Sequence, residues 1–305
     1  MIESVLQKAI KEKKDFEVKF RAVWPDETVH YIHSFGHMDV GSDQSLVNVI
    51  GVNWDVTKEA TIDQQKTEFV SLASHQLKTP VGAMRWNLEM LINGDYGQIA
   101  PEQKVILEET LTLDLRMNEL VNSLLNVSRI EMGVLLVEPI PTDVRPLCVE
   151  VLKEMAQRIA QKGHTITTDF SDKIPTIPVD AKLMRILFQN FLSNAIKYTQ
   201  DKGKIDVVLK VIKDELVYSV TNNGEPIPAE DQAKIFGKMY RASNAQKQDP
   251  DGNGLGLYLV KEIVTHSGGR LWFTSNKKSG TTFGIAYPLT GMLRHEGTKT
   301  LTEIQ

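Results

Sequence analysis

The sequence predicts a multidomain α+β protein, because three different patterns follow one another along its 305 residues. Strand-like runs occupy 16–23, 29–35 and 46–52 and are separated by turn residues. Two long amphipathic helical patterns follow between 58 and 132, and helical and strand patterns alternate from 137 to 290. A chain of this length is expected to form about two or three domains, each of which can bury its own core.

The composition is that of an ordinary globular protein. Hydrophobic residues make up 41% of the chain and charged residues 24%, which is typical of globular domains. The formal net charge of −4 gives no reason to expect nucleic acid or an anionic membrane as a partner. The single cysteine, Cys148, excludes an intrachain disulfide and a cysteine-rich metal site.

The sequence contains neither a membrane-spanning pattern nor a secretory leader. No apolar run approaches the ~18 residues of a transmembrane helix, and the N-terminus lacks the layout of a signal peptide. We therefore expect a cytoplasmic chain that makes no membrane contact of its own. A parent protein tethered to a membrane through further N-terminal sequence is left open.

The first segment, 1–57, combines a short helical pattern with the three strand-like runs. Turn residues at Pro25-Asp26 and Gly41-Ser-Asp43 separate the runs, and the segment ends in Gly51-Val-Asn-Trp-Asp-Val-Thr57. This order resembles the C-terminal part of a PAS sensor domain, and the resemblance implies a partial antiparallel sheet ahead of a signalling helix.

Three histidines in this segment raise the alternative of a metal site. They are His30, His33 and His37. Residues 30 and 33 of one strand point to opposite faces of the sheet, so ordinary sheet residues are the preferred interpretation.

The second segment reads as a pair of long helices. The first runs from about residue 58 to Ile92, where Asn93-Gly-Asp-Tyr-Gly97 interrupts it, and the second starts near Pro101, a residue suited to a first helical turn. Two helices cannot enclose a core alone, so we expect a homodimer in which two hairpins form a four-helix bundle. A plain coiled-coil spacer is the alternative.

His75 lies off the apolar stripe of the first helix, within Ser74-His-Gln-Leu-Lys-Thr-Pro80. Pro80 lacks a backbone donor, which frees the Gln76 carbonyl and should bend the helix close to the histidine. Neutral imidazole is a good nucleophile near pH 7, and a phosphoramidate formed on it can pass its phosphoryl group onward. An isolated histidine of this kind is usually a plain surface residue, so the interpretation depends on the rest of the chain.

The third segment carries residues suited to a nucleotide. Asn190, Asn194 and Lys197 lie on neighbouring turns of one predicted helix, with Tyr198 adjacent. Such residues can offer a carbonyl to Mg²⁺, an ammonium group to phosphate and a ring to a base. The glycine-rich run at 251–257 precedes an apolar helix, where backbone N–H groups can close on phosphate oxygens.

Taken together, these motifs resemble those of sensor histidine kinases. The His75 box, the asparagine box, Ile235-Phe236, Tyr240-Arg241 and the glycine box occur in the order of that family. The resemblance implies an α/β sandwich of the superfamily that unites gyrase, Hsp90, histidine kinases and MutL, with a polar lid over the nucleotide at 242–251. It divides the chain into a PAS-like part at 1–57, a dimerisation and histidine phosphotransfer domain at 58–135, a catalytic ATP-binding domain at 136–290 and a tail at 291–305, expected to be a loose extension.

The resemblance also implies individual roles. His75 would attack the γ-phosphorus of ATP, and Thr79, one turn later, would orient a water that dephosphorylates a partner. Asn194 would coordinate Mg²⁺, with support from Asn190. The other implied nucleotide-binding residues are Lys197, Tyr198, Asn222, Gly224, Ile227, Tyr240, Arg241, Gly252, Gly254, Leu255, Gly256 and Thr281. The implied partners are a second copy of the chain and the receiver domain of a response regulator, whose aspartate accepts the phosphoryl group.

Two departures from the family pattern affect the chemistry. The family usually has an acidic residue after the histidine, and Gln76 can hold the imidazole N–H but cannot take its proton. The family's base-reading aspartate is replaced by Asn222, which loses charge assistance, and Pro226 stands where a glycine is usual.

These departures keep a second hypothesis open beside the ATP-dependent histidine kinase. The alternative is a dimeric module that binds nucleotide weakly and acts as a scaffold or as a response-regulator phosphatase through Thr79. A third hypothesis, an ATPase clamp of the Hsp90 or MutL kind, leaves the box around His75 unexplained.

Overall fold

The computed structural model describes residues 2–40, 46–249, 252–297 and 300–301. Close contacts divide the chain into two compact units, Met1–Phe69 and Val70–Gln305, each of which is described by itself. Among the described residues, no helix combines the length and the apolar character that a membrane span requires.

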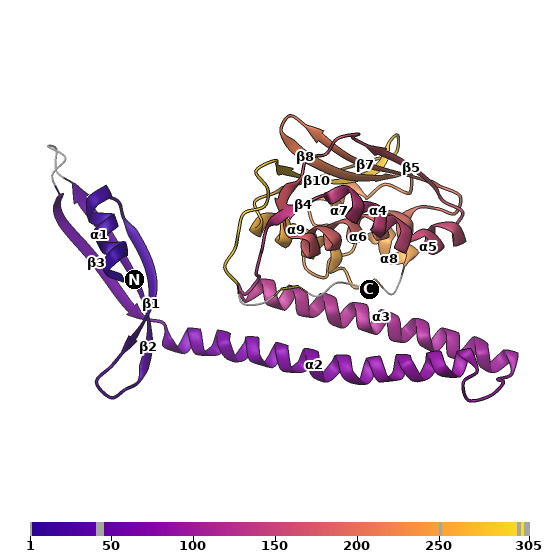
Figure 1. Ribbon diagram of the computed structural model, residues 1–305, viewed down its shortest axis with the longest axis horizontal. Coiled ribbons are helices and arrows are strands. Elements are labelled where there is room, and N and C mark those ends of the chain that lie inside the picture. The colour runs from indigo at the N-terminus through magenta and orange to yellow at the C-terminus, as the bar shows by residue number, and fades with distance from the viewer. Residues whose placement is uncertain (1, 41–45, 250–251, 298–299, 302–305) are drawn as a thin grey trace. The chain divides into compact units, whose positions relative to one another are not determined.

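The N-terminal unit contains a three-stranded antiparallel sheet in the order β1-β2-β3 (Figure 1). Its elements are helix α1 (Ile2–Glu12) and strands β1 (Phe16–Val23), β2 (Val29–Val40) and β3 (Leu46–Asp55). β1 alternates between half-buried and exposed side chains, as expected for a strand with one covered face. The antiparallel sheet that the sequence predicts is confirmed, while the predicted turn at 41–43 lies outside the described residues. The PAS interpretation stays a prediction.

The three histidines of this sheet each pair with a different carboxylate. His30 lies 2.6 Å from Asp55, His33 lies 2.6 Å from Glu17, and His37 lies 2.9 Å from Asp15. Within the described ranges, no group of three or more histidine, cysteine, aspartate or glutamate side chains is placed to hold a metal ion. Each histidine is therefore hydrogen-bonded to its own carboxylate.

The helical hairpin consists of α2 (Thr57–Asn93) and α3 (Pro101–Glu131). α2 is a continuous helix that includes Pro80. The connection turns at Gly94 and Gly97, both at positive φ, a region that favours glycine. At the start of α3 the Gln103 side chain accepts a hydrogen bond from the Ala100 N–H at 2.9 Å, which satisfies a backbone donor that the helix leaves unpaired. The two helices that the sequence predicts are therefore present at nearly the predicted bounds.

The C-terminal domain is a five-stranded mixed sheet in the order β5-β7-β8-β10-β9, with helices packed on one face (Figure 1). β5 and β7 are parallel and the other neighbours are antiparallel. β4 and β6 form a separate antiparallel pair. The bounds are β4 (Ile140–Thr142), α4 (Val144–Glu154), α5 (Ala156–Gln161), β5 (Thr165–Phe170), β6 (Ile177–Val179), α6 (Ala181–Tyr198), β7 (Lys204–Ile212), β8 (Glu215–Asn222), α7 (Ala229–Gln232), α8 (Ser243–Gln248), α9 (Gly256–His266), β9 (Arg270–Asn276) and β10 (Gly280–Pro288).

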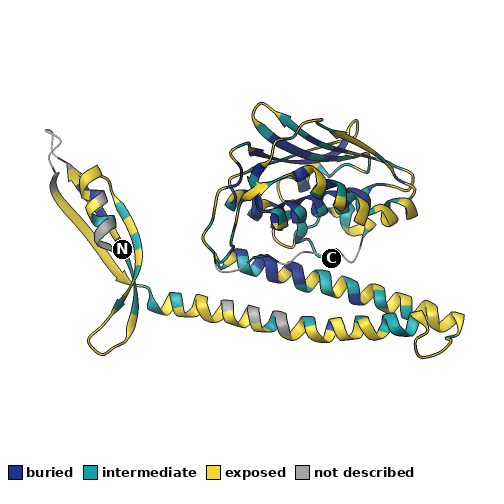
Figure 2. Ribbon diagram, in the orientation of Figure 1, coloured by how far each residue is buried: buried dark blue, intermediate teal, exposed yellow. Residues whose placement is uncertain are grey.

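The main hydrophobic core lies between this sheet and helices α4, α6 and α9 (Figure 2). Phe188 and Phe191 of α6 pack against Tyr218 of β8, with ring centroids 4.3 and 6.1 Å apart. Asp180 caps the start of α6, and its side chain accepts hydrogen bonds from the backbone N–H groups of Lys182 and Leu183. Because α6 is fixed at its start and along its apolar face, the polar residues near its end are held in register with the sheet.

The C-terminal tail differs from the loose extension that its sequence suggests. Met292 is buried and its N–H donates to the Pro178 carbonyl at 2.8 Å. His295 pairs with Val137 across an antiparallel bridge, and Leu301, 4% exposed, belongs to the main core. The prediction was wrong for the described tail residues, because a few isolated apolar side chains can fill gaps in a core without any helical or strand period.

The Cys148 thiol is expected to resist alkylation in the folded chain. It is 1% exposed within α4, and burial raises its pKa to about 12, whereas the thiolate is the reactive form. Ellman's reagent should react with the native chain more than about a hundredfold more slowly than with the denatured chain. Rapid stoichiometric reaction under native conditions would contradict this packing of α4.

Candidate functional site

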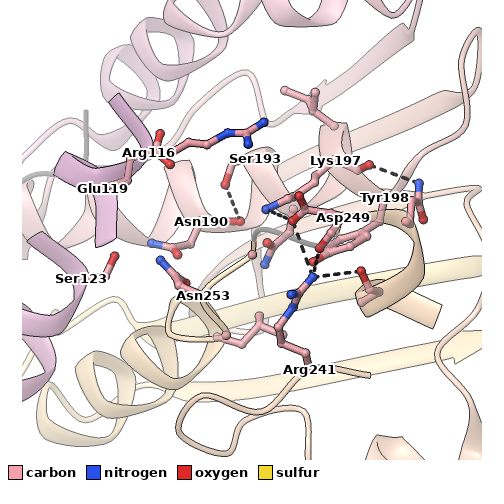
Figure 3. Close-up of a pocket in the computed structure, with 18 of the residues that line it drawn as sticks. Arg116, Glu119, Ser123, Asn190, Ser193, Lys197, Tyr198, Arg241, Asp249 and Asn253 are labelled. Atoms are coloured by element: carbon pink, nitrogen blue, oxygen red, sulfur yellow. Dashed lines mark hydrogen bonds and ion pairs between the residues drawn. The ribbon is translucent and has the colours of Figure 1, made fainter. Parts of the chain in front are cut away.

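A cavity of about 900 Å³ lies where α3, α6, the end of β8 and the start of α9 meet (Figure 3). Its volume is in the range of small-molecule and cofactor sites. Most predicted nucleotide-binding residues line this cavity: Asn190, Asn194, Lys197, Tyr198, Asn222, Ile227, Tyr240, Arg241, Gly252, Gly254, Gly256 and Thr281. The residues that the sequence singled out from five separate stretches are thus gathered around one space.

Asn190 is positioned by its own helix. Its side-chain N–H donates to the Ile186 carbonyl at 2.8 Å, one turn earlier in α6. Its amide oxygen faces Gly256, the first residue of α9, where an added Cβ would lie 2.6 Å from that oxygen. Asn190 therefore packs closely against the start of α9. Asn194, one turn later, also lines the cavity.

Asn222 joins the ends of two strands at the back of the cavity. Its amide is oriented by the hydrogen-bonding groups around it: with Nδ2 toward the Thr281 carbonyl at 3.2 Å, Oδ1 accepts from the Gly224 N–H at 3.1 Å. Gly224 is required here because an added Cβ would lie 2.0 Å from the Tyr198 carbonyl oxygen. Gly224 thus supports the wall rather than lining the cavity.

A hydroxyl pair fixes the neighbouring loop. The Ile227 N–H donates to the Ser275 hydroxyl at 2.8 Å, which lies 2.7 Å from the Thr281 hydroxyl. Ile227 and Thr281, both predicted from the sequence, are therefore held by a serine that the sequence did not single out.

The Tyr240 hydroxyl points to a carboxylate. It donates to Asp231 at 2.5 Å, while the other Asp231 oxygen accepts from the Ser243 N–H at 2.8 Å and from its hydroxyl at 3.0 Å. The bond to Asp231 raises the pKa of Tyr240 and lowers that of Asp231. Tyr240 therefore ties the segment before α8 to α7.

The glycine-rich segment packs closely on its neighbours. Gly254 has φ +67, and a Cβ there would lie 2.7 Å from the Met239 carbonyl carbon and 2.9 Å from the Tyr240 carbonyl oxygen. Leu255 is fully buried beside it, so its side chain anchors the segment instead of lining the cavity. The segment leads directly into α9 at Gly256.

Just before the glycine-rich segment, two cationic side chains lie close to one carboxylate. Lys197 forms an ion pair with Asp249, and the Arg241 guanidinium lies 3.8 Å from the same carboxylate oxygen (Figure 3). The sequence marked Lys197 and Arg241 as phosphate contacts, but it gave no sign of Asp249 as their partner, because this pairing depends on the tertiary fold.

Helix α3 contributes a wall of the cavity that sequence reasoning missed. Arg116, Glu119 and Ser123 line it from the hairpin, and Glu119 lies 3.8 Å from Arg158 of α5. Burial raises the pKa of Glu119, although Arg158, Lys197 and Arg116 oppose the shift. The feature of the sequence that could have pointed to these residues is that they are polar and interrupt the apolar repeat of α3.

The predicted phosphoacceptor region lies on α2. His75 belongs to this helix, and its side chain lies outside the described residues. Gln76 and Thr79 are exposed. Both polar side chains are therefore accessible on α2.

Comparisons with known proteins agree with this arrangement. A family model described as "His Kinase A (phospho-acceptor) domain" matches residues 65–133, and one described as "Histidine kinase-, DNA gyrase B-, and HSP90-like ATPase" matches residues 179–291. The chain is 30% identical to sensor histidine kinase WalK of Bacillus subtilis (strain 168) over 250 residues, 79% of this chain and 39% of WalK. The chain belongs to the sensor histidine kinase family.

The chain is also similar to a further relative and to two solved structures. Adaptive-response sensory kinase SasA of Nostoc sp. is 28% identical over 272 residues, which cover 82% of this chain and 67% of SasA. Full-length ShkA in complex with AMPPNP has a TM-score of 0.60 at 24% identity, covering 74% of this chain and 46% of ShkA. Histidine kinase ThkA in complex with response regulator protein TrrA has a TM-score of 0.50 at 22% identity, covering 95% and 83% of the two chains. At these identities the likeness shows a shared fold.

Proposed function

We propose that this chain is an ATP-dependent protein-histidine kinase that phosphorylates His75 and transfers the phosphoryl group to an aspartate of a response regulator. The single observation that carries the proposal is the gathering of asparagines, cations and a glycine-rich segment around one cavity of about 900 Å³. The match of the phosphoacceptor family to 65–133 supports His75 as the acceptor. The named complex of ThkA with a response regulator supports the class of partner.

The proposed reaction forms one bond and breaks one. An imidazole nitrogen of His75 attacks the γ-phosphorus of ATP, a P–N bond forms, and the P–O bond to ADP breaks. The imidazole loses its proton during or after the attack. Gln76 can hold the other ring N–H through its amide oxygen, but an amide does not accept a proton, so the proton leaves to solvent or to another base.

The cavity residues would hold the nucleotide. Tyr198 is proposed to pack on the adenine, which Asn222 contacts through its amide, while Lys197 and Arg241 bind phosphate oxygens. Asn194 is proposed to hold Mg²⁺ through its amide oxygen, an oxygen ligand that suits this ion. Bound Mg²⁺ would neutralise charge on the phosphates. Gly252, Gly254 and Gly256 would let the backbone approach the phosphates at the start of α9.

The hairpin surface supports a homodimer. Apolar side chains remain exposed along both of its helices, which is unfavourable in water unless a partner covers them. Away from the nucleotide cavity, they include Leu72, Leu77, Met84 and Trp86 of α2 and Val105, Ile106 and Leu124 of α3. We propose that a second copy covers this surface as a four-helix bundle.

Replacing Gln76 with glutamate is expected to raise the autophosphorylation rate or to shift its pH optimum. A carboxylate at this exposed position can take the imidazole proton, a contribution of about a hundredfold where general-base catalysis is fully effective. The rate should be measured across a range of pH. Asn87→Asp, which adds the same charge at an exposed position about three turns further along α2, is the matched control. No rise in rate at any pH would refute the assigned role of residue 76.

The experiment that tests the proposed function is incubation of the whole chain with Mg²⁺ and γ-labelled ATP. The expected result is label that is lost in acid and retained in base, the behaviour of a phosphoramidate. ATP binding without label would reject the kinase in favour of a scaffold or a phosphatase that acts through Thr79. Absence of ATP binding would reject the nucleotide site itself.

A further inference from the structure

The two cations proposed to bind phosphate already bind an internal anion. Asp249 pairs with Lys197 of α6, and its carboxylate lies 3.8 Å from the Arg241 guanidinium. The side chains of Asp249 and Arg241 are 19% and 14% exposed, so this pairing is partly shielded from water. Figure 3 shows all three side chains meeting in the cavity.

The carboxylate is held in this position by the segment that carries it. The Asp249 N–H donates to the Ala245 carbonyl at 3.0 Å, and Arg241 donates to the carbonyls of both residues. The Gln248 side chain donates to the Lys197 carbonyl at 3.3 Å, which ties the end of α8 to the end of α6. The position of Asp249 is therefore specified by several contacts besides its charge.

The glycine-rich segment closes over the same carboxylate. A Cβ at Gly252 would lie 2.7 Å from the Asp249 Oδ2 and 3.0 Å from the Arg241 Cζ. The carboxylate thus lies between two cations and a glycine backbone. The same surroundings, two cations and a close backbone, are those that a phosphate group requires.

A carboxylate and a phosphate cannot occupy this position together. Both are anions that accept charge-assisted hydrogen bonds from lysine and arginine, and two like charges at contact repel each other strongly in a shielded site. A polyphosphate carries more charge and more acceptor oxygens than one carboxylate, so it can displace Asp249. Uncharged adenosine gains nothing from that displacement.

We propose that Asp249 is an internal competitor for the phosphate position of the nucleotide site, and that it lowers nucleotide affinity and determines how strongly the site discriminates between nucleotides by phosphate charge. The inference rests on the proposed function, to which it adds Asp249 as a residue that lowers nucleotide affinity. When ATP binds, Lys197 and Arg241 exchange their contacts with Asp249 for contacts with the phosphates. The free energy of ATP binding is therefore reduced by the free energy needed to break the contacts with Asp249.

Asp249→Asn tests this proposal in the whole chain. The variant keeps the shape of the side chain and removes its charge, and we expect it to bind Mg-ATP about five- to tenfold more tightly than the parent, because each tenfold step corresponds to about 1.4 kcal/mol. Affinity for adenosine, measured by competition, should change less than about twofold, since adenosine lacks the charge that competes. Asp249→Glu keeps the charge and should retain the affinity of the parent.

Controls separate competition from two other effects. Asp201→Asn removes one charge from an exposed turn just after α6 and should leave the affinity for ATP nearly unchanged, which excludes a general electrostatic effect. Titration with ATP in the presence of EDTA tests whether Asp249 is instead a ligand of Mg²⁺. Thermal unfolding of each variant shows whether the fold is retained.

The outcomes are distinct. Tighter binding of ATP by Asp249→Asn alone supports the competition. Unchanged or weaker binding overturns it, and weakening confined to Mg-ATP would identify a metal ligand. An equal gain for adenosine also overturns it, because that gain would not depend on phosphate. If neither the parent nor any variant binds ATP, the proposed function fails first and this inference fails with it.

Discussion

Replacing His75 with alanine is expected to abolish phosphorylation of the chain while leaving ATP binding intact. The imidazole supplies the only nitrogen that the mechanism phosphorylates, so label from γ-labelled ATP should fall below about 1% of the parent, as for loss of any covalent nucleophile. His75 lies on α2, whereas the nucleotide cavity is lined by α3 and the C-terminal domain. The affinity for ATP should therefore remain within about twofold, a change of less than ~0.5 kcal/mol.

A second histidine provides the control for this variant. His37 is exposed in the N-terminal sheet, where it pairs with Asp15. His37→Ala should keep full labelling, because its role is limited to this ion pair. Persistent acid-labile label on the His75 variant would show that another histidine is the acceptor.

Replacing Gly254 with alanine is expected to cause the largest loss of nucleotide binding among the glycine variants of the cavity. The residue has φ +67, and its Cβ would lie under 3.0 Å from the backbone of Met239 and Tyr240. Positive φ costs a non-glycine residue about 1–2 kcal/mol, and the clash forces the segment away from its neighbours. ATP affinity, measured by calorimetry, should fall by about tenfold or more, since tenfold corresponds to about 1.4 kcal/mol.

Gly82 offers a matched control for the same chemical change. It lies within α2, and nothing lies within 4 Å of the position that its Cβ would take. Gly82→Ala should bind ATP like the parent, and its helix should be stabilised by about 0.5–1 kcal/mol, because alanine loses less backbone entropy than glycine. Normal ATP binding by the Gly254 variant would show that the segment tolerates a side chain and would contradict its close approach.

Long periodic elements were predictable from the sequence because their signal is local. The bounds of α2 and α3 follow from the helical period, from Asn93-Gly-Asp-Tyr-Gly97 and from Pro101, each of which acts within a few residues. The strands of the N-terminal sheet were placed correctly but were too short, since β2 continues to Val40 and β3 to Asp55. Pairing with a neighbouring strand extended them, and such pairing is not visible in a single run of residues.

The candidate site was predictable where it depends on motifs and not where it depends on tertiary contacts. Asn190, Lys197 and Gly254 belong to short boxes with a direct chemical meaning, so they could be named from the sequence. Asp249 and Glu119 could not, because their roles arise from side chains brought together across the fold. The tail was mistaken for the same reason, since the burial of Leu301 depends on a gap in the core.

The most direct test of the central claim is to map the phosphorylated residue after incubation of the whole chain with Mg-ATP. Peptides should be prepared at neutral to basic pH, where a phosphoramidate survives, and fragmented by mass spectrometry. We expect a single phosphorylated peptide that contains His75, with the added mass on the imidazole. Phosphate on any other residue, or no phosphate on a chain that binds ATP, would contradict it.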